Sequence, residues 1–445
     1  MRQPGHVPRL QAPRRGVRAG AGRAGRRARR GAGGRAMKWF ALPGRAKAGA
    51  AQIPMPVRVG YVGPSASRML DYDQNLLWVI VLLLAFGLVM VYSATIAIPE
   101  DPHYASWSQF HFFGRDLAAV ALGLVAGWVA FQFPMSFWQR WAPYLFILSL
   151  VGLFAVLIPF IGKGVNGSRR WIPLGVLNFQ PSELVKLTMV LYASDFMVRK
   201  QQVKQSATKA FGPMAAALAF IGLLLLAEPD MGAFLVIASV AMVILYLGGV
   251  NGRMFAALSV VVIGAFVLMI VLSPWRRDRI FAYLNPWAQD NSEGSAYQLA
   301  HALIAVGRGH WFGVGLGGSV EKLHYLPEPQ TDFLLAIVGE ELGFVGVIVL
   351  IGVFAWLTKR AFDIGRQALA ADRMFSALVA QAIGVLIGGQ AFINIGVNLG
   401  LLPTKGLTLP LLSYGGSATL ISLVALALLL RVDYENRVLM RGGHA

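Results

Sequence analysis

The sequence predicts an all-α, polytopic membrane protein with ten transmembrane helices, and three observations support this fold class. The chain of 445 residues is 56% hydrophobic but only 14% charged, whereas soluble domains carry about 25% charged residues. Ten apolar segments each approach the roughly 20 residues that a helix needs to cross a bilayer. One long polar stretch, Ser273–Phe333, separates the seventh segment from the eighth.

A basic segment precedes the first apolar one. Residues 1–70 contain sixteen Lys or Arg and no Asp or Glu, so most of the formal net charge of +19 belongs to them. They lack an apolar stretch and are predicted to be a disordered tail. Such a tail is compatible with binding to anionic lipid or nucleic acid. We interpret it as a solvated cytoplasmic tail that orients the first helix, and predict no nucleic-acid partner. Met37 is an alternative start, and no cleavable signal peptide is predicted.

The predicted membrane domain covers residues 71–437, and residues 438–445 form a second cytoplasmic tail. The ten segments span residues 75–95, 113–132, 141–161, 181–198, 211–228, 231–249, 253–273, 332–357, 376–399 and 412–431.

Short-loop Lys and Arg predict the orientation. They gather before the first segment and after the fourth, eighth and tenth, and such residues mark the cytoplasmic side. Both termini are therefore predicted to be cytoplasmic, in a multi-pass protein of the cytoplasmic (inner) membrane. Residues 274–331 then form a large extracytoplasmic loop between helices 7 and 8. This loop is expected to fold as a cap, and Tyr297–Val306 has a helical apolar pattern.

Several cations lie on the predicted outer side, where orientation does not require them. One interpretation is that they pair with local acids. The other is a binding site for an anion such as phosphate, which arginine binds through two parallel hydrogen bonds. These cations are Lys163, Arg169, Arg170, Arg276, Arg277, Arg279, Arg308 and Lys322.

Ionisable residues also occur within or beside the apolar segments, where they are expensive and often functional. Glu183 and Lys186 are three residues apart and share a helix face. They either form an internal ion pair or line a cavity. Asp230 lies in a tight outer hairpin, as a simple turn residue or as part of a site. Glu340 and Glu341 are adjacent, so they point to different faces of their helix.

The chemistry available in the cap is that of carboxylates beside an anion site. A carboxylate can take a proton from an attacking hydroxyl, while cations stabilise charge on a leaving group. Transfer from a lipid pyrophosphate suits this set, and transport of an amphipathic anion is equally compatible. The glycine-rich run Gly313–Ser319 is interpreted as a turn with unusual backbone angles. The candidate acids are Asp290, Glu293, Glu328 and Asp332.

Five motifs together resemble the SEDS family (shape, elongation, division and sporulation), which includes FtsW, RodA and SpoVE. The resemblance covers residues 70–437 and is closer to the FtsW branch than to the RodA branch. The motifs are SRRWIPLG with FQPSELVKL, AEPDMG, NPWAQD with YQL, GRGHWFGVGLGGSVEKLHYLPEPQTDFLLAIVGEELG, and PTKGLTLPLLSYGGS.

The resemblance implies a peptidoglycan glycosyltransferase that polymerises lipid II, an undecaprenyl-pyrophosphate substrate, at the division septum. It also implies a class B penicillin-binding protein (an FtsI-type transpeptidase) and other divisome proteins as partners, besides membrane lipids. Three alternatives stay open. They are a lipid II flippase or transporter, a structural divisome scaffold, and a RodA-like elongation polymerase.

The family's essential acid falls on Asp290, which the resemblance implies is the general base for the acceptor 4-hydroxyl. Undecaprenyl pyrophosphate would be the leaving group. The loop is two residues longer here than the family pattern, so Glu293 is the alternative base. Gln330 stands where the family usually has histidine, so a proton carrier is not expected at that position.

Further site residues follow from the resemblance. Arg169, Arg170 and Lys322 are candidates for binding the pyrophosphate. The cavity candidates are Glu183, Lys186, Asp230, Thr404, Lys405 and Ser413, although small residues in the last motif also suit helix packing. No metal ligands are identified, and a divalent cation (Mg²⁺ or Mn²⁺) shared by carboxylates and pyrophosphate is compatible with the sequence.

Overall fold

The computed structural model describes residues 72–100, 108–165, 168–173, 175, 178–203, 212–271, 273–288, 294 and 296–442. The tail predicted at residues 1–70 lies outside this described part, as do Asp290 and Glu293. The described chain is mostly helical.

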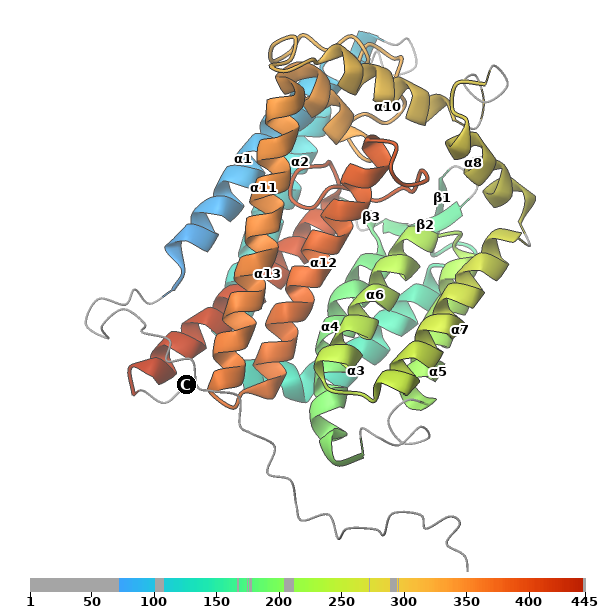
Figure 1. Cartoon of the computed structure of the whole chain (residues 1–445). Coiled ribbons are helices and arrows are strands. Elements are labelled where there is room, and N and C mark those ends of the chain that lie inside the picture. Colours follow the sequence, from blue (N-terminus) through green and yellow to red (C-terminus); the bar gives the residue numbers. More distant parts are fainter. Residues whose placement is uncertain are drawn as a thin grey trace, which may run out of the picture. The chain divides into compact units, whose positions relative to one another are not determined.

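Each of the ten predicted apolar segments coincides with a helix of the described part (Figure 1). Six of these helices (α1, α2, α7, α11, α12 and α13) are long and apolar enough to cross a membrane, while α5 and α6 are shorter apolar helices. The chain is therefore a multi-pass membrane protein. The bounds are α1 Gln74–Thr95, α2 His111–Gln132, α3 Met135–Ala155, α4 Pro181–Arg199, α5 Gly212–Ala227, α6 Met231–Leu247, α7 Gly252–Val271, α11 Leu334–Ala370, α12 Met374–Asn398 and α13 Gly416–Met440.

Shorter elements complete the fold. The helices α8 (Pro274–Leu284) and α10 (Tyr297–Arg308) lie in the predicted cap, and the 3-10 turns η2 (Ile98–Glu100) and η3 (Gln201–Val203) follow α1 and α4. A three-stranded antiparallel sheet, β1 (Lys163–Val165), β2 (Ser168–Pro173) and β3 (Asn178–Phe179), corrects the all-α prediction. Ile172 pairs with Phe179 in this sheet. Strands this short give little sequence pattern, because two to six residues show few alternations.

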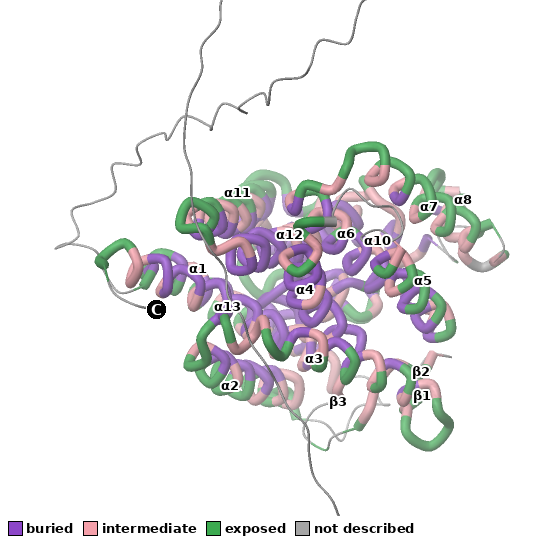
Figure 2. Tube along the Cα trace, turned by 90° about the horizontal axis from the view of Figure 1, so that it is seen from below, coloured by how far each residue is buried: buried purple, intermediate pink, exposed green. Residues whose placement is uncertain are grey.

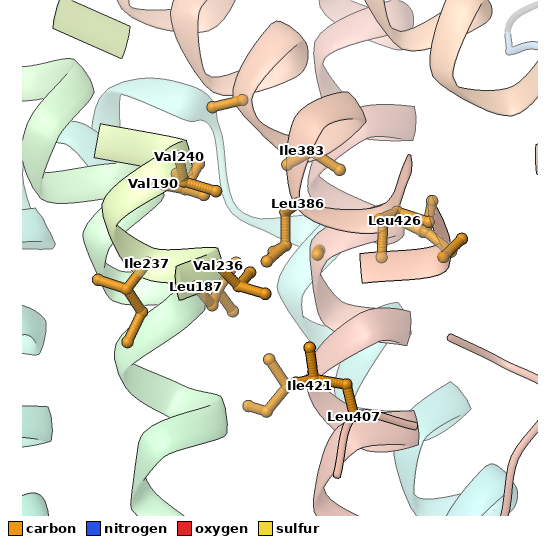
Figure 3. Packing of buried hydrophobic residues seen from close by; sticks show 14 of the residues in the cluster. Leu187, Val190, Val236, Ile237, Val240, Ile383, Leu386, Leu407, Ile421 and Leu426 are labelled. Atoms are coloured by element: carbon orange, nitrogen blue, oxygen red, sulfur yellow. The ribbon is translucent and has the colours of Figure 1, made fainter. Parts of the chain in front are cut away.

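The centre of the bundle is built around α4. Nearly all of its residues are buried, whereas α7 buries only Leu258 (Figure 2). Leu187 and Val190 of α4 pack with Val236 of α6 and Leu386 of α12 (Figure 3). Because lipid tails are as apolar as these side chains, such contacts hold the helices by close packing and not by removal from water.

A break in α11 receives part of the cap. Gly343 has φ 69° and ψ −166°, a conformation that only glycine adopts readily. The loop before α11 fills the break, since Phe344 N–H donates to His310 O at 2.9 Å and Val314 N–H donates to Glu340 O at 2.9 Å. Gly313 also has a positive φ of 82°. The turn predicted for the glycine-rich run is thus confirmed, and it fixes the cap on α11.

The two ends of the bundle differ in chemistry. We call the end that carries α8, α10 and the sheet the cap end (Figure 1). The opposite end, where α4, α11 and α13 terminate, gathers arginines that form ion pairs, and we call it the basic end.

Candidate active site

Two adjoining cavities lie at the cap end, with volumes of about 600 and 400 Å³. Helix α6, strand β2 and the loops before α11 and α13 contribute to both, whereas α4 contributes to the smaller one alone. The residues that line both are Ser168, Arg170, Asp230, Glu328, Asp332 and Gly406. Those of the larger cavity alone include Arg276, Arg279, Gln298, Thr404 and Lys405. Those of the smaller cavity alone include Arg115, Glu183, Thr331 and Tyr414.

The larger cavity is rich in cations. Arg170, Arg276, Arg279 and Lys405 all line it. Burial, together with repulsion from Arg279 and Arg276, lowers the pKa of the Lys405 ammonium to about 8. Like charges held this close in a partly dry site indicate a place for a ligand with several negative charges.

Two acids stand among these cations. Burial raises the pKa of the Asp332 carboxyl to about 7, aided by the charge of Glu328 and opposed by Arg170. Burial also raises the pKa of Glu328, against a hydrogen bond from Thr331. Carboxyls with raised pKa values in a cleft are typical of catalytic and binding sites.

Arg170 and Asp230 are fixed by the α5–α6 hairpin and the start of α4. Arg170 donates from Nε to Glu228 O at 3.0 Å and from Nη2 to Pro229 O at 2.6 Å. Asp230 caps α6, since Oδ1 accepts from Ala233 N–H at 3.1 Å, while Oδ2 accepts from Ser182 Oγ at 3.1 Å. Both residues were predicted as site residues, and the structure places both in the lining of the two cavities.

The predicted pair of Glu183 and Lys186 lies on α4 directly beside the smaller cavity. Lys186 Nζ donates to Glu183 Oε1 at 2.7 Å and to Gln390 Oε1 at 3.2 Å. Glu183 lines the cavity, whereas Lys186 is buried and does not. A buried ammonium needs such partners, because leaving it unpaired in the interior is costly. The pair therefore combines both predicted alternatives, an ion pair and a cavity wall.

Asn394 and Asn398, one turn apart on α12, hold two walls of the site together. The Nδ2 atoms donate to Asp332 O at 2.9 and 3.0 Å, and Asn394 also donates to Leu407 O at 2.6 Å. Sequence reasoning missed these residues. The signal was present, because Gln390, Asn394 and Asn398 recur every four residues along an otherwise apolar helix.

Besides Lys186, three predicted site residues lie outside the lining of both cavities. Arg169 is exposed, because alternate residues of β2 point to opposite faces and Arg170 takes the inner one. Lys322 is buried and donates to Glu341 Oε1 at 2.8 Å and Ser93 Oγ at 3.0 Å. Ser413 Oγ accepts from Leu409 N–H at 3.0 Å within a turn. In contrast, Thr404 and Lys405 line the larger cavity as predicted.

Comparison with known proteins identifies the family. The family model described as "Cell cycle protein", for FtsW, RodA and SpoVE, matches residues 74–438. The chain belongs to the FtsW/RodA/SpoVE family.

Curated members of the FtsW/RodA/SpoVE family resemble the chain over nearly its whole length. A protein of Thiomonas intermedia is 69% identical over 395 residues, which cover 88% of this chain and 96% of the relative. One of Burkholderia thailandensis is 55% identical and matches all of both chains. Both are named probable peptidoglycan glycosyltransferase FtsW.

Solved structures of the family share the fold. Rod shape determining protein RodA of Thermus thermophilus is 28% identical, with a TM-score of 0.59 over 82% of this chain and 98% of that one. A chain from a structure described as the structural coordination of polymerization and crosslinking by a peptidoglycan synthase complex is 27% identical. It gives a TM-score of 0.65 over 83% of this chain and 99% of that one.

The acid that the FtsW/RodA/SpoVE resemblance assigned as general base, Asp290, lies outside the described residues, as does Glu293. The described residues on either side of this segment include Arg279 of α8 and Gln298 of α10, and both line the larger cavity. Within the described part, no group of three or more His, Cys, Asp or Glu is placed to hold a metal ion.

Proposed function

We propose that this protein is a peptidoglycan glycosyltransferase that polymerises lipid II at the outer face of the cytoplasmic membrane. The observation that carries the proposal is the cap-end cavity, in which four cations surround acids with raised pKa values. The names of the close relatives support the same reaction class. In this proposal ten helices span the membrane, both termini are cytoplasmic, and residues 274–331 lie outside.

The reaction divides between a base and the cations. Asp290 takes the proton from the acceptor 4-hydroxyl, and that oxygen attacks the anomeric carbon of the donor with inversion. Arg276, Arg279 and Lys405 stabilise the undecaprenyl pyrophosphate that leaves. The residues that flank Asp290 in the sequence support these roles. Helix α8 before it and helix α10 after it both contribute side chains to the larger cavity. Glu293 is the alternative base.

The two cavities suit a reaction with two lipid-linked substrates. The larger one has three cations that the smaller one lacks, so we assign it to the pyrophosphate of the donor, which must depart. The smaller one, with Arg115 at its wall, is assigned to the acceptor. Arg170, Asp230 and Asp332, which line both, are then at the junction where the sugars meet.

The partner and the place of action follow from the family. One solved neighbour comes from a peptidoglycan synthase complex that couples polymerization with crosslinking. We propose that this chain likewise works with a class B penicillin-binding protein, at the division septum that the FtsW relatives imply.

The deciding experiment measures glycan polymerisation from labelled lipid II by the purified chain with its penicillin-binding partner. Asp290→Asn is expected to lower the rate at least a hundredfold, in line with loss of a general base. Glu293→Gln is expected to lower it less than tenfold. The matched control is Asp278→Asn, which removes an exposed acid of α8 that lines neither cavity.

The variants must insert and bind the partner as the wild type does, which co-purification checks. Undiminished polymer from Asp290→Asn would overturn the base assignment. If Glu293→Gln alone abolished the reaction, the base would move to Glu293. If the wild-type chain polymerised lipid II only when the partner was present, neither assignment would be affected.

A further inference from the structure

A separate hollow of about 510 Å³ lies at the basic end between the first turns of α3 and the last turn of α4. Ser136, Gln139, Arg140 and Tyr144 line it from α3, and Asp195 and Arg199 line it from α4. None of these residues lines the cap-end cavities. The volume falls within the roughly 300–1,000 Å³ typical of ligand pockets.

The charges in the hollow favour an anion. Asp195 is already occupied, since Oδ2 accepts from Arg199 Nε at 2.6 Å and Oδ1 accepts from Gln139 Nε2 at 3.4 Å. Arg140 is exposed, and no acidic side chain among the described residues forms an ion pair with it. Two arginines and one aspartate leave a net positive charge, and the acid has little capacity for a further cation.

Aromatic side chains place the hollow at the membrane–water boundary. Phe137 and Trp141 have ring centroids 6.0 Å apart, and Trp141 and Tyr144 have centroids 5.7 Å apart. Trp141 and Tyr144 are exposed, and such residues concentrate where lipid headgroups begin. Farther along α3, Ile147 and Val151 are 57% and 58% exposed. A polar hollow thus continues into an apolar, lipid-facing helix surface.

We propose that this hollow is a binding site for an anionic phospholipid. The phosphate binds Arg140, whose guanidinium can donate two parallel hydrogen bonds, and Ser136 lies one turn earlier on the same face of α3. The acyl chains follow Tyr144 and Ile147. Basic hollows between helices at the cytoplasmic side are typical of such headgroup sites. The bound lipid bridges α3 and α4 and stabilises the pair, which is independent of the reaction at the cap end.

The test uses the purified full-length chain, incubated in detergent with phosphatidylglycerol, phosphatidylethanolamine or phosphatidylcholine. Native mass spectrometry counts retained lipid, and thermal unfolding measures stability. Phosphatidylglycerol is expected to be retained several-fold more than either zwitterionic lipid and to raise the Tm by a few degrees. Arg140→Gln is expected to lose both effects. Arg140→Lys, which keeps the charge but not the paired donors, is expected to retain an intermediate amount.

The matched control is Arg253→Gln. Arg253 is also an exposed arginine at the basic end, on α7, but it does not line the hollow. This variant is expected to retain phosphatidylglycerol as the wild type does. Equal retention by Arg140→Gln and the wild type would overturn the proposal, as would a preference for phosphatidylethanolamine. An equal loss in both arginine variants would also overturn it, because it would indicate a diffuse surface charge.

Discussion

At the scale of single residues, an acid and a base of the larger cavity both have pKa values near neutral pH. Asp332, with a pKa of about 7, gains a negative charge as the pH rises. Lys405, with a pKa of about 8, loses its positive charge at a higher pH than the one at which Asp332 ionises. Both changes make the cavity less attractive to pyrophosphate. Because burial disfavours the charged form of both groups, the site binds an anion of constant charge most strongly at mildly acidic pH, where Asp332 is neutral and Lys405 is charged.

This predicts how the Kd for inorganic pyrophosphate depends on pH. The Kd, divided by that of the double variant Asp332→Asn/Lys405→Arg at the same pH so that ionisation of the ligand cancels, is expected to rise between pH 6 and pH 9. The rise should occur in two steps of about five- to tenfold each, or about 1 kcal/mol per step. Asp332→Asn should remove the lower step, and Lys405→Arg should remove the upper one, because arginine stays charged. Calorimetric titration at constant ionic strength measures both. A ratio of the two Kd values that stayed constant over this range would contradict the assignment of these two groups to the anion site.

At the scale of elements, α2 and α13 approach each other through small residues. Gly123 and Gly127 are four residues apart on α2, in the small-xxx-small pattern of membrane helix pairs. A Cβ atom at Gly123 would lie 2.6 Å from Leu423 Cδ1 and 3.2 Å from Leu420 Cα. The close contact therefore depends on the missing side chain, and α13 is held there in the orientation that brings Tyr414 to the smaller cavity.

Gly123→Leu is consequently expected to separate α2 from α13 and to lower the Tm in detergent by several degrees, because overpacking costs about 1–3 kcal/mol. Gly114→Leu is the control, since Gly114 lies on the same helix and a Cβ atom there would meet open space. Gly123→Ala should have a smaller effect, because the nearest atom is the end of a flexible leucine. A Tm equal in both leucine variants would show that the α2–α13 contact does not limit stability.

At the scale of the whole molecule, the sequence predicted the helices better than the site. Ten apolar runs are visible without a fold, because each approaches the length that a membrane-spanning helix needs. The placement of side chains depends on contacts that the sequence does not display. Lys322 pairs with Glu341 and Ser93, and Ser93 is 229 residues away from it in the chain. Arg169 and Arg170 are adjacent in the sequence, and only the strand they share decides which one faces the cavity.

The ion pairs of the basic end bear on the choice between a fixed site and a transporter. Glu435 of α13 pairs with Arg373 at the start of α12 at 2.5 Å and with Arg431 at 2.9 Å, and its Oε1 accepts from Met135 N–H of α3 at 2.8 Å. Asp73 pairs with Arg360 and so joins α1 to α11. These buried pairs close the end opposite the cavities. A transporter that exposed its site to both sides would have to break them, whereas a polymerase with a fixed outer site would not.

Cross-linking tests this, because the chain has no native cysteine. Arg373→Cys with Glu435→Cys, joined by a bifunctional thiol reagent, ties α12 to α13 at the basic end. A polymerase with a fixed outer site is expected to keep the rate that the same double variant shows with a monofunctional reagent, because no step requires that end to open. Polymerisation of labelled lipid II measures the rate, and mass spectrometry the extent of cross-linking. A rate that fell in proportion to the cross-linked fraction would show that the basic end must open during turnover, and would favour alternating access.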